Sequence, residues 1–413
     1  MDIKPAGLRT ILSPLLKAFL LALLLANLAT GMYTPFLPLY LLERQAGAAQ
    51  VGIFFSILTL INLIFTLLGG WLSDALGRLR SVALGSLAGI LSFVGLLWAP
   101  SWQWAILGAG LIFVARSLTS PAQHAFIADQ TGEADRGRAF SLVHSLKTGS
   151  HIAAPLIGGW LIEAVGYWGL FAAAGSLYLI ATVIRFALAR RSQETRSAPA
   201  SLQGLKSSLG ALWTLVLAGG IFTWLLLVDG FSDIAATLGE VFQPIFLEGR
   251  GVGPLEIGAI GSLAALANLA GIAGSGWFAD RYGERRPIAA GLLLSGLAMF
   301  WFSAAKSGWS FAAAWAAVEF STGLIVPAFS ALLSKVVPAQ VRGTAFGLLS
   351  TSAGVFSLPA PALGGVLHER LTPAAPFLLA CGTLLASLAA VLIKFPGKST
   401  EASGQAAVQV GAD

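Results

Sequence analysis

Charged residues are scarce in this chain. Of its 413 residues only 11% are Asp, Glu, Lys or Arg, whereas 56% are hydrophobic. Average soluble proteins contain about 25% charged residues, and a soluble fold of this length has too small a core to bury so many apolar side chains. The composition therefore excludes an ordinary soluble protein and indicates a protein that crosses a membrane many times.

The sequence has a single cysteine and none of the common catalytic motifs. The single cysteine, Cys381, excludes an internal disulfide and says nothing about the redox compartment. The sequence has no Walker motif, no Cys/His spacing suited to a metal and no nucleophile elbow. We therefore expect no enzymatic activity, no ATP-driven transport, no metal and no cofactor. Residues 1–17 lack a small-residue cleavage site, so we expect the first apolar run to remain as a membrane helix.

Long apolar runs are what the sequence has instead. About 20 helical residues cross the hydrocarbon core of a bilayer, and irregular backbone cannot face lipid. The sequence therefore predicts an all-α membrane protein with twelve transmembrane helices, at residues 15–41, 51–72, 81–99, 103–127, 139–163, 168–188, 210–236, 255–278, 288–305, 309–332, 342–366 and 374–393.

The distribution of Lys and Arg predicts the orientation of these helices. With the N-terminus in the cytoplasm, 19 Lys and Arg residues, Arg185 among them, fall on cytoplasmic segments. Four fall outside, and only Arg116 and Lys147 fall within the membrane. Positive charge accumulates on the cytoplasmic side of membrane proteins, so both termini are expected inside, in the cell (inner) membrane. This bias also accounts for the net charge of +6 without a nucleic-acid partner.

The chain contains one six-helix unit twice, offset by 206 residues. The coincidences concentrate in Gly, Pro, Asp, Arg and Trp, so they do not arise from shared apolar composition; examples are Gly70 and Gly276, Trp71 and Trp277, Asp74 and Asp280, Gly77 and Gly283, and Pro155 and Pro361. An even number of helices makes the repeat parallel, and substrate sites in such proteins lie between the halves near the midplane. We expect bundles at residues 1–188 and 210–413, a cytoplasmic linker at 189–209 and a short polar cytoplasmic tail.

Two motifs give this repeat a family resemblance. The stretch Gly70-x-Leu72-x-Asp74-x-x-Gly77-Arg78-x-Arg80 resembles motif A of the major facilitator superfamily. The stretch Ala154-Pro155-Leu156-Ile157-Gly158-Gly159 is similar to the antiporter motif of the drug–proton antiporter branch, with Ala154 in place of the first glycine. Arg116 matches the arginine of the branch's helix-4 motif, although Thr119 and Ser120 replace the glutamine and glycine that follow it. The resemblance implies the two-bundle major facilitator fold.

The resemblance also implies a gate formed by the motif A residues, which would hold the cytoplasmic side shut in the outward-open state. At the offset of 206, Arg78 corresponds to Glu284 and Asp129 to Lys335, so both signs invert together. We expect Arg78–Asp129 and Glu284–Lys335 to be equivalent ion pairs of opposite polarity, the alternative being unrelated solvated charges. The expected gating residues are Gly70, Asp74, Gly77, Arg78, Arg80, Asp129, Gly276, Asp280, Arg281, Gly283, Glu284 and Lys335.

Ionisable residues inside the predicted helices are the candidates for substrate binding or proton coupling, since such residues normally face a cavity or a partner. The basic candidates are Arg116, His144, Lys147 and His151, the last three on one helix face at spacings of three and four. The acidic candidates are Asp229, Asp233 and Glu319. The acids could carry the coupling proton, the basic groups could bind an anion, or the groups could serve only as polar contacts between helices.

The leading hypothesis is a proton-coupled secondary transporter that exports organic small molecules or drugs by alternating access. One alternative is a carrier of small organic anions bound by Arg116 and Lys147, and a further alternative is a membrane sensor that transports nothing. The expected partners are a small-molecule substrate, protons and the lipid bilayer. We expect the protein to be a monomer.

Overall fold

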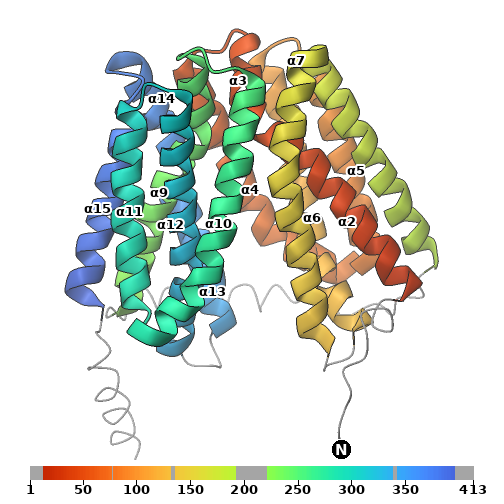
Figure 1. Cartoon of the computed structure of the whole chain (residues 1–413). Coiled ribbons are helices and arrows are strands. Elements are labelled where there is room, and N and C mark those ends of the chain that lie inside the picture. The colour runs from red at the N-terminus through yellow and green to blue at the C-terminus, as the bar shows by residue number, and fades with distance from the viewer. Residues whose placement is uncertain (1–12, 77, 132–134, 192–220, 338–341, 396–413) are drawn as a thin grey trace, which may run out of the picture. The chain divides into compact units, whose positions relative to one another are not determined.

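A computed structural model describes residues 13–76, 78–131, 135–191, 221–337 and 342–395, and all regular structure in these residues is helical (Figure 1). Gly77, most of the expected linker at 189–209, the first part of the run predicted at 210–236 and the expected polar tail from residue 396 lie outside the described residues.

The helices of the first repeat follow the predicted apolar runs. The first run becomes α2, η1 and α3 because Pro35 and Pro38 each begin a new helical segment. Gly166 interrupts the long helix α7, where a φ of 71° leaves the helical region. This interruption divides α7 into the two predicted crossings. The elements are α2 (Pro14–Tyr33), η1 (Thr34–Phe36), α3 (Leu37–Glu43), α4 (Ala48–Leu76), α5 (Arg78–Leu97), α6 (Trp102–Gln130) and α7 (Arg136–Arg191).

The helices of the second repeat are α9 (Ile221–Glu248), α10 (Pro254–Tyr282), α11 (Arg285–Ala304), α12 (Gly308–Val336), α13 (Arg342–Ser357), α14 (Ala360–Arg370) and α15 (Ala375–Lys394). The predicted end of the seventh run at residue 236 is wrong. Helix α9 continues to Glu248, because residues 241–247 are all buried and carry the helix through Pro244. The eleventh run is broken at Pro359 into α13 and α14.

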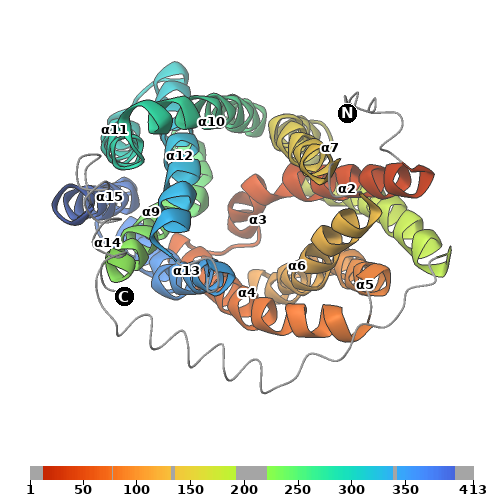
Figure 2. The ribbon, with the colours of Figure 1, turned by 90° about the horizontal axis from the view of Figure 1, so that it is seen from below.

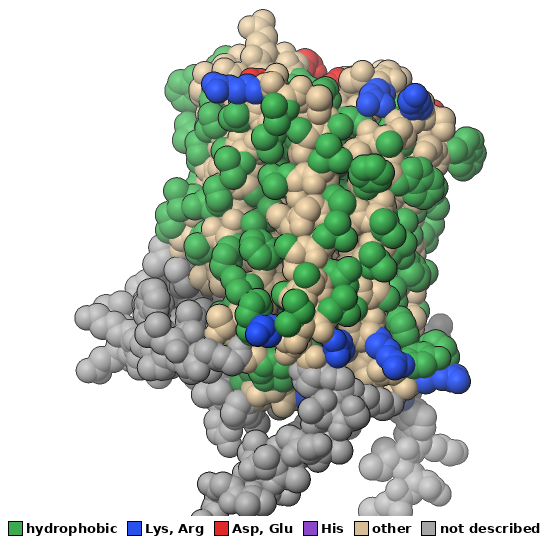
Figure 3. All heavy atoms as spheres, turned by 90° about the vertical axis from the view of Figure 1, so that its left-hand side faces the viewer, with side chains coloured by type: hydrophobic (Ala, Val, Ile, Leu, Met, Phe, Trp, Pro, Cys, Tyr) green, Lys and Arg blue, Asp and Glu red, His purple; other side chains and the backbone are tan. Residues whose placement is uncertain are grey.

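Ten helices of the described residues are long and apolar enough to cross a membrane. Since α7 contains two crossings and α13 with α14 makes another, the described residues account for the twelve predicted crossings. Figure 3 shows hydrophobic side chains over the height of one face, with Lys and Arg near its two ends. Exposed apolar residues such as Leu297, Phe300 and Leu392 are suited to contact with lipid.

The chain forms two compact units. The first contains residues 1–201 and 251–262, and the second contains residues 202–250 and 263–413, so the boundary falls inside α10. In the first unit α2 packs on α7, and both α4 and α5 pack on α6. In the second unit α11 packs on α12 and α15, and α15 also packs on α9 (Figure 2).

Helices α10 and α12 approach each other closely within the second unit. A Cβ atom at Gly271 would collide with the backbone carbonyl of Phe320, and a Cβ atom at Gly323 would collide with the backbone carbonyl of Asn268. Small residues permit such backbone contacts between membrane helices. The two glycines therefore bring the polar side chains of α10 and α12 within hydrogen-bonding range.

This close contact predicts the effect of adding one methyl group. Gly323→Ala should lower the melting temperature of the detergent-solubilised protein, because overpacking costs about 1–3 kcal/mol. Gly382→Ala in α15 is the control, since its added Cβ meets no atom within 4 Å. Equal melting temperatures for Gly323→Ala and the unchanged protein would contradict the packing argument.

Candidate functional site

Both ion pairs predicted from the repeat are present. Arg78, at the start of α5, pairs with Asp129 near the end of α6. Lys335, near the end of α12, pairs with Glu284, which precedes α11, at a distance of 2.5 Å between Nζ and Oε1. The pairs occupy equivalent places in the two repeats and have opposite polarity, which contradicts the alternative that these four charges are unrelated.

The two pairs differ in how far water reaches them. The side chains of Arg78 and Asp129 are 34% and 53% exposed, whereas that of Glu284 is only 7% exposed beside Lys335 at 58%. The Oε2 atom of Glu284 is buried without a hydrogen-bond partner among the described atoms. Burying a carboxylate is costly without a counter-charge. The ion pair with Lys335 therefore offsets the cost of burying the Glu284 carboxylate.

The structure describes some of the other residues that were expected to form the gate. Gly283 has a φ of 79° in the turn before α11, a conformation that favours glycine, and this explains why the second motif keeps this residue. Arg281 lies over the rings of Trp277 and Tyr282, 5.6 Å from each centroid. Arg80 on α5 is exposed, as are Gly276 and Asp280 on α10. The burial of Gly70 and Asp74, and all of Gly77, lie outside the described part.

The antiporter-like motif on α7 makes contacts on two sides within the first unit. A Cβ atom at Gly158 would collide with the backbone carbonyl of Met32 in α2, and one at Gly159 would collide with that of Pro254 in α10. The carbonyl of Pro155 leaves no room for a Cβ atom at Gly258. These residues therefore allow α7 to pack closely against α2 and the first turns of α10.

Glu163, one turn after Gly159 on α7, is not among the residues predicted for the site. Its Oε1 atom accepts a hydrogen bond from the backbone N–H of Leu255 at 3.0 Å, at the start of α10. The carboxylate thus satisfies one of the free N–H groups of the first helical turn. Its spacing of four from Gly159 is the signal that could have revealed it.

The basic candidates gather in the first unit. Arg116 on α6 interacts electrostatically with Lys147 and His151 on α7, and His144 is exposed on the same helix. Neither Arg116 nor Lys147 has an ion pair among the described residues. Arg185, which the charge count placed on a cytoplasmic segment, is instead buried in α7 at 3% exposure and donates a hydrogen bond to Ser86 Oγ. Six further helical residues follow Arg185 before α7 ends at Arg191, so Arg185 lies inside the helix and not in the connection after it.

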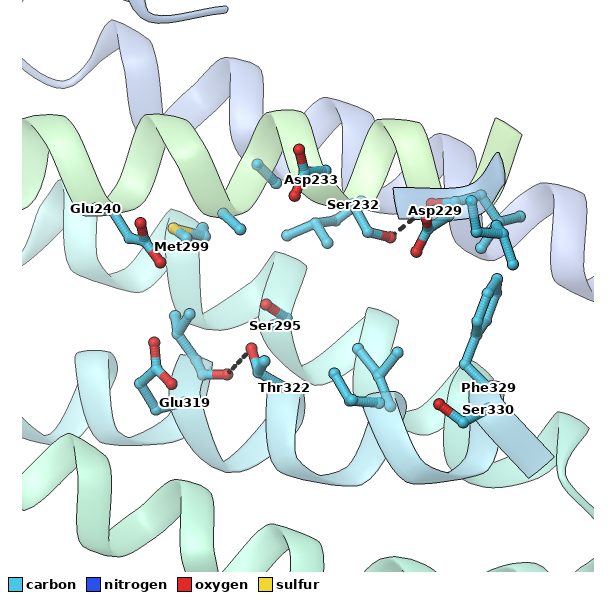
Figure 4. A pocket seen from close by; sticks show the side chains of 18 of the residues that line it. Asp229, Ser232, Asp233, Glu240, Ser295, Met299, Glu319, Thr322, Phe329 and Ser330 are labelled. Carbon is cyan, nitrogen blue, oxygen red and sulfur yellow. Dashed lines mark hydrogen bonds between the residues drawn. The ribbon is translucent and has the colours of Figure 1, made fainter. Parts of the chain in front are cut away.

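The acidic candidates line one cavity in the second unit. Its volume is about 390 Å³, and its carboxylates are Asp229, Asp233 and Glu240 on α9 and Glu319 on α12 (Figure 4). Asp229 and Asp233 lie on one face of α9, as their spacing of four predicts. The sequence analysis did not single out Glu240 as a site residue, although it lies seven residues after Asp233 and so on the same face. No Lys, Arg or His occurs among the described residues that line this cavity.

The cavity combines these acids with hydroxyl and aromatic groups. The hydroxyl groups belong to Ser232, Ser295, Thr322 and Ser330, and apolar surface comes from residues such as Met299, Trp315 and Phe329. Asp229 interacts electrostatically with Asp233, and Glu319 interacts with Glu240. Nearby carboxylates repel each other when all are ionised, so a proton or an organic cation in this cavity relieves that repulsion.

A hydrogen bond from α10 holds Glu319. The Nδ2 atom of Asn268 donates to the backbone carbonyl of Glu319 at 3.0 Å and to its Oε2 atom at 3.2 Å. The Glu319 carboxylate therefore has a defined hydrogen-bond donor on a neighbouring helix.

A helical membrane bundle with an internal acidic cavity and paired charges at its helix ends has the architecture of a membrane carrier. The family model described as Major Facilitator Superfamily matches residues 19–246 and 231–410. The chain therefore belongs to the major facilitator superfamily, a family of membrane transporters of small molecules. This confirms the family resemblance and the predicted fold class.

Three curated relatives have similar lengths. Tetracycline resistance protein, class G, of Vibrio anguillarum is 26% identical over 356 residues, which cover 83% of this chain and 88% of that protein. Quinolone resistance protein NorA of Staphylococcus aureus is 23% identical over 380 residues, which cover 89% and 93%. The multi-drug resistance efflux pump PmrA homolog of Lactococcus lactis is 22% identical over 345 residues, which cover 82% and 84%.

Solved structures share the fold. A peptide transporter POT in complex with sulfate matches with a TM-score of 0.74 and 14% identity, covering 91% of this chain and 92% of its own. A bacterial homologue of the human lysosomal transporter Spinster, inward-facing and unoccupied, matches with a TM-score of 0.69 and 16% identity, covering 92% and 94%.

The unequal burial of the two ion pairs predicts unequal effects on stability. Lys335→Ala should destabilise the protein by about 1–3 kcal/mol, because it leaves the buried Glu284 carboxylate without its counter-charge. Arg78→Ala should cost about 0–1 kcal/mol, as expected for a solvent-exposed pair. Chemical unfolding of the purified protein measures both, with Lys335→Arg as the charge-preserving control. Equal losses for Lys335→Ala and Arg78→Ala would contradict this difference.

Proposed function

We propose that this protein is a proton-coupled exporter of cationic organic drugs. The bundles at 1–188 and 210–413 alternate access to the substrate, with the linker at 189–209 between them. The protein acts as a monomer in the cell (inner) membrane with both termini in the cytoplasm. The relatives named as tetracycline, quinolone and multi-drug resistance proteins support drug export.

The acidic cavity is the single observation that carries this proposal. Four carboxylates line it, and no cationic side chain occurs among its described lining residues. Trp315, Phe329 and Met299 provide apolar surface for a hydrophobic molecule. A drug-sized cavity of mainly apolar lining with a few fixed polar groups is typical of small-molecule sites, and here the fixed groups select positive charge.

Proton and drug compete for the same charges in this proposal. Glu319 carries the coupling proton in this proposal, since its carboxylate accepts a hydrogen bond from Asn268 on another helix and lies beside Glu240. Asp229 and Asp233, side by side on α9, attract the cationic group of the drug. When Glu319 is protonated the cavity holds less negative charge and the cation leaves, and when Glu319 is ionised the cavity binds the cation again. The energy of the proton gradient thereby drives export.

The basic cluster in the first unit supports the second candidate function, transport of small organic anions. Arg116, Lys147 and His151 interact with one another, and neither Arg116 nor Lys147 has an ion pair among the described residues. An anionic group would neutralise this cluster. Lys147→Ala distinguishes the candidates, because it should abolish binding of an anionic substrate and leave binding of a cation intact.

We further propose that the Arg78–Asp129 and Glu284–Lys335 pairs belong to the cytoplasmic gate. The first pair joins the start of α5 to the end of α6, and the second joins the turn before α11 to the end of α12. In the proposal, the two helix ends that each pair joins move together when the gate opens. The motif A residues Gly70, Asp74 and Gly77 complete this gate in the proposal.

The proton role of Glu319 predicts a separation between driven transport and exchange. In proteoliposomes, Glu319→Gln should abolish accumulation of ethidium driven by a pH gradient, because the amide cannot take up the coupling proton. Exchange of labelled for unlabelled ethidium without a gradient should remain, because it needs no proton transfer. The control is Glu256→Gln, which changes an exposed carboxylate near the start of α10. Unchanged pH-driven accumulation in Glu319→Gln would show that the proton assignment is wrong.

A further inference from the structure

Asn268 lies in the middle of α10 and contacts Glu319 twice through one nitrogen. Its Nδ2 atom donates to the backbone carbonyl of Glu319 at 3.0 Å and to the carboxylate Oε2 atom at 3.2 Å. One amide group therefore binds both the backbone carbonyl and the side-chain carboxylate of the same residue. This arrangement restricts the rotation of the Glu319 side chain and fixes the position of its carboxylate.

The contact between α10 and α12 fixes the position of the amide in turn. The carbonyl of Asn268 packs directly on Gly323, and Gly271 packs on the carbonyl of Phe320. Two turns further along, Ser275 Oγ donates to the carbonyl of Leu324 at 2.8 Å. Asn268 and Ser275 thus both join α10 to α12 by hydrogen bonds, and of these two Asn268 also reaches a carboxylate.

Among the described residues that line its cavity, the charged groups that accompany Glu319 are all acidic. Glu240, Asp233 and Asp229 line the same cavity from α9. Helices α11, α13 and α15 contribute only uncharged residues among the described lining. A hydrogen bond donated to a carboxylate stabilises its charged form, and in this acidic surrounding the Asn268 amide opposes the repulsion between carboxylates.

We infer that Asn268 is a positioning residue for proton coupling, which holds the Glu319 carboxylate and sets the pH range over which the protein exchanges proton for drug. This inference rests on the proposed function, in which Glu319 carries the proton. When the carboxyl group takes up the proton, the negative charge on the acceptor is lost, while the bond to the backbone carbonyl keeps α10 and α12 together. Protonation therefore weakens the hydrogen bond from Asn268 to the Glu319 carboxyl group without separating α10 from α12.

The experiment measures ethidium efflux from proteoliposomes as a function of pH on the proton-donating side. Asn268→Leu removes the donor at similar size, and Asn268→Asp keeps the shape but replaces the donor with an acceptor. Both should move the midpoint of the pH profile to higher pH, by about one unit or a tenfold change in proton affinity for Asn268→Leu. The cause is the lost stabilisation of the charged carboxylate.

Ser275→Ala is the matched structural control, because it removes a hydrogen bond between α10 and α12 that involves no carboxylate. It should lower the melting temperature and leave the pH midpoint unchanged. In a Glu319→Gln background, where ethidium exchange without a gradient should remain, Asn268→Leu should not change how that exchange depends on pH. A pH midpoint that stays constant in both folded Asn268 variants would overturn the inference.

The same series separates this inference from the proposed function. If Glu319→Gln removes the pH dependence while both Asn268 variants keep the original midpoint, Glu319 carries the proton and Asn268 does not position it. If Glu319→Gln retains the original pH dependence, the proposed role of Glu319 fails, and the inference about Asn268 fails with it. Asn268 variants that lose stability to the same extent as Ser275→Ala but shift the midpoint support the positioning role.

Discussion

The cost of placing charge in an apolar helical bundle is the constraint on which this structure depends. Helices satisfy their own backbone groups in a membrane, so the interior polar chemistry rests on a small number of side chains. Several of these polar side chains have an identified hydrogen-bond partner. Asn268 holds Glu319, Ser86 accepts a hydrogen bond from Arg185, and Glu163 binds the first turn of α10. The ionisable candidates for the site differ in sign between the units, with Arg116, Lys147 and His151 in the first and an acidic cavity in the second.

Close packing and polar chemistry are linked in the second unit. Gly271 and Gly323 remove the side chains that would separate α10 from α12, and the short distance that results lets an asparagine reach a glutamate on the next helix. Helix α10 also carries Pro254 and Gly258, which pack on the antiporter-like motif of α7 within the first unit. One continuous helix therefore contacts both the motif and the carboxylate.

Much of this arrangement follows from the sequence because two signals are strong. Apolar length predicts the crossings, and the 206-residue repeat predicts both ion pairs, since the reversal of Arg78 to Glu284 is matched by that of Asp129 to Lys335. The Asn268–Glu319 bond could not be predicted, because it depends on where α10 and α12 cross and not on any local spacing. The end of α9 was misjudged for a similar reason: burial against other helices carries it past residue 236.

The opposite polarity of the two ion pairs has a consequence for folding. The two halves share one six-helix pattern, so during membrane insertion a helix of one half could pack against the equivalent partner in the other half. If both pairs had the same polarity, Arg78 would attract the equivalent of Asp129 in the other half as well as its own partner. With the observed signs, exchanging the partners of the two pairs would bring Arg78 to Lys335 and Glu284 to Asp129, and both of these combinations carry like charges. The sign reversal therefore disfavours packing between helices of different halves, because the incorrect ion pairs would repel.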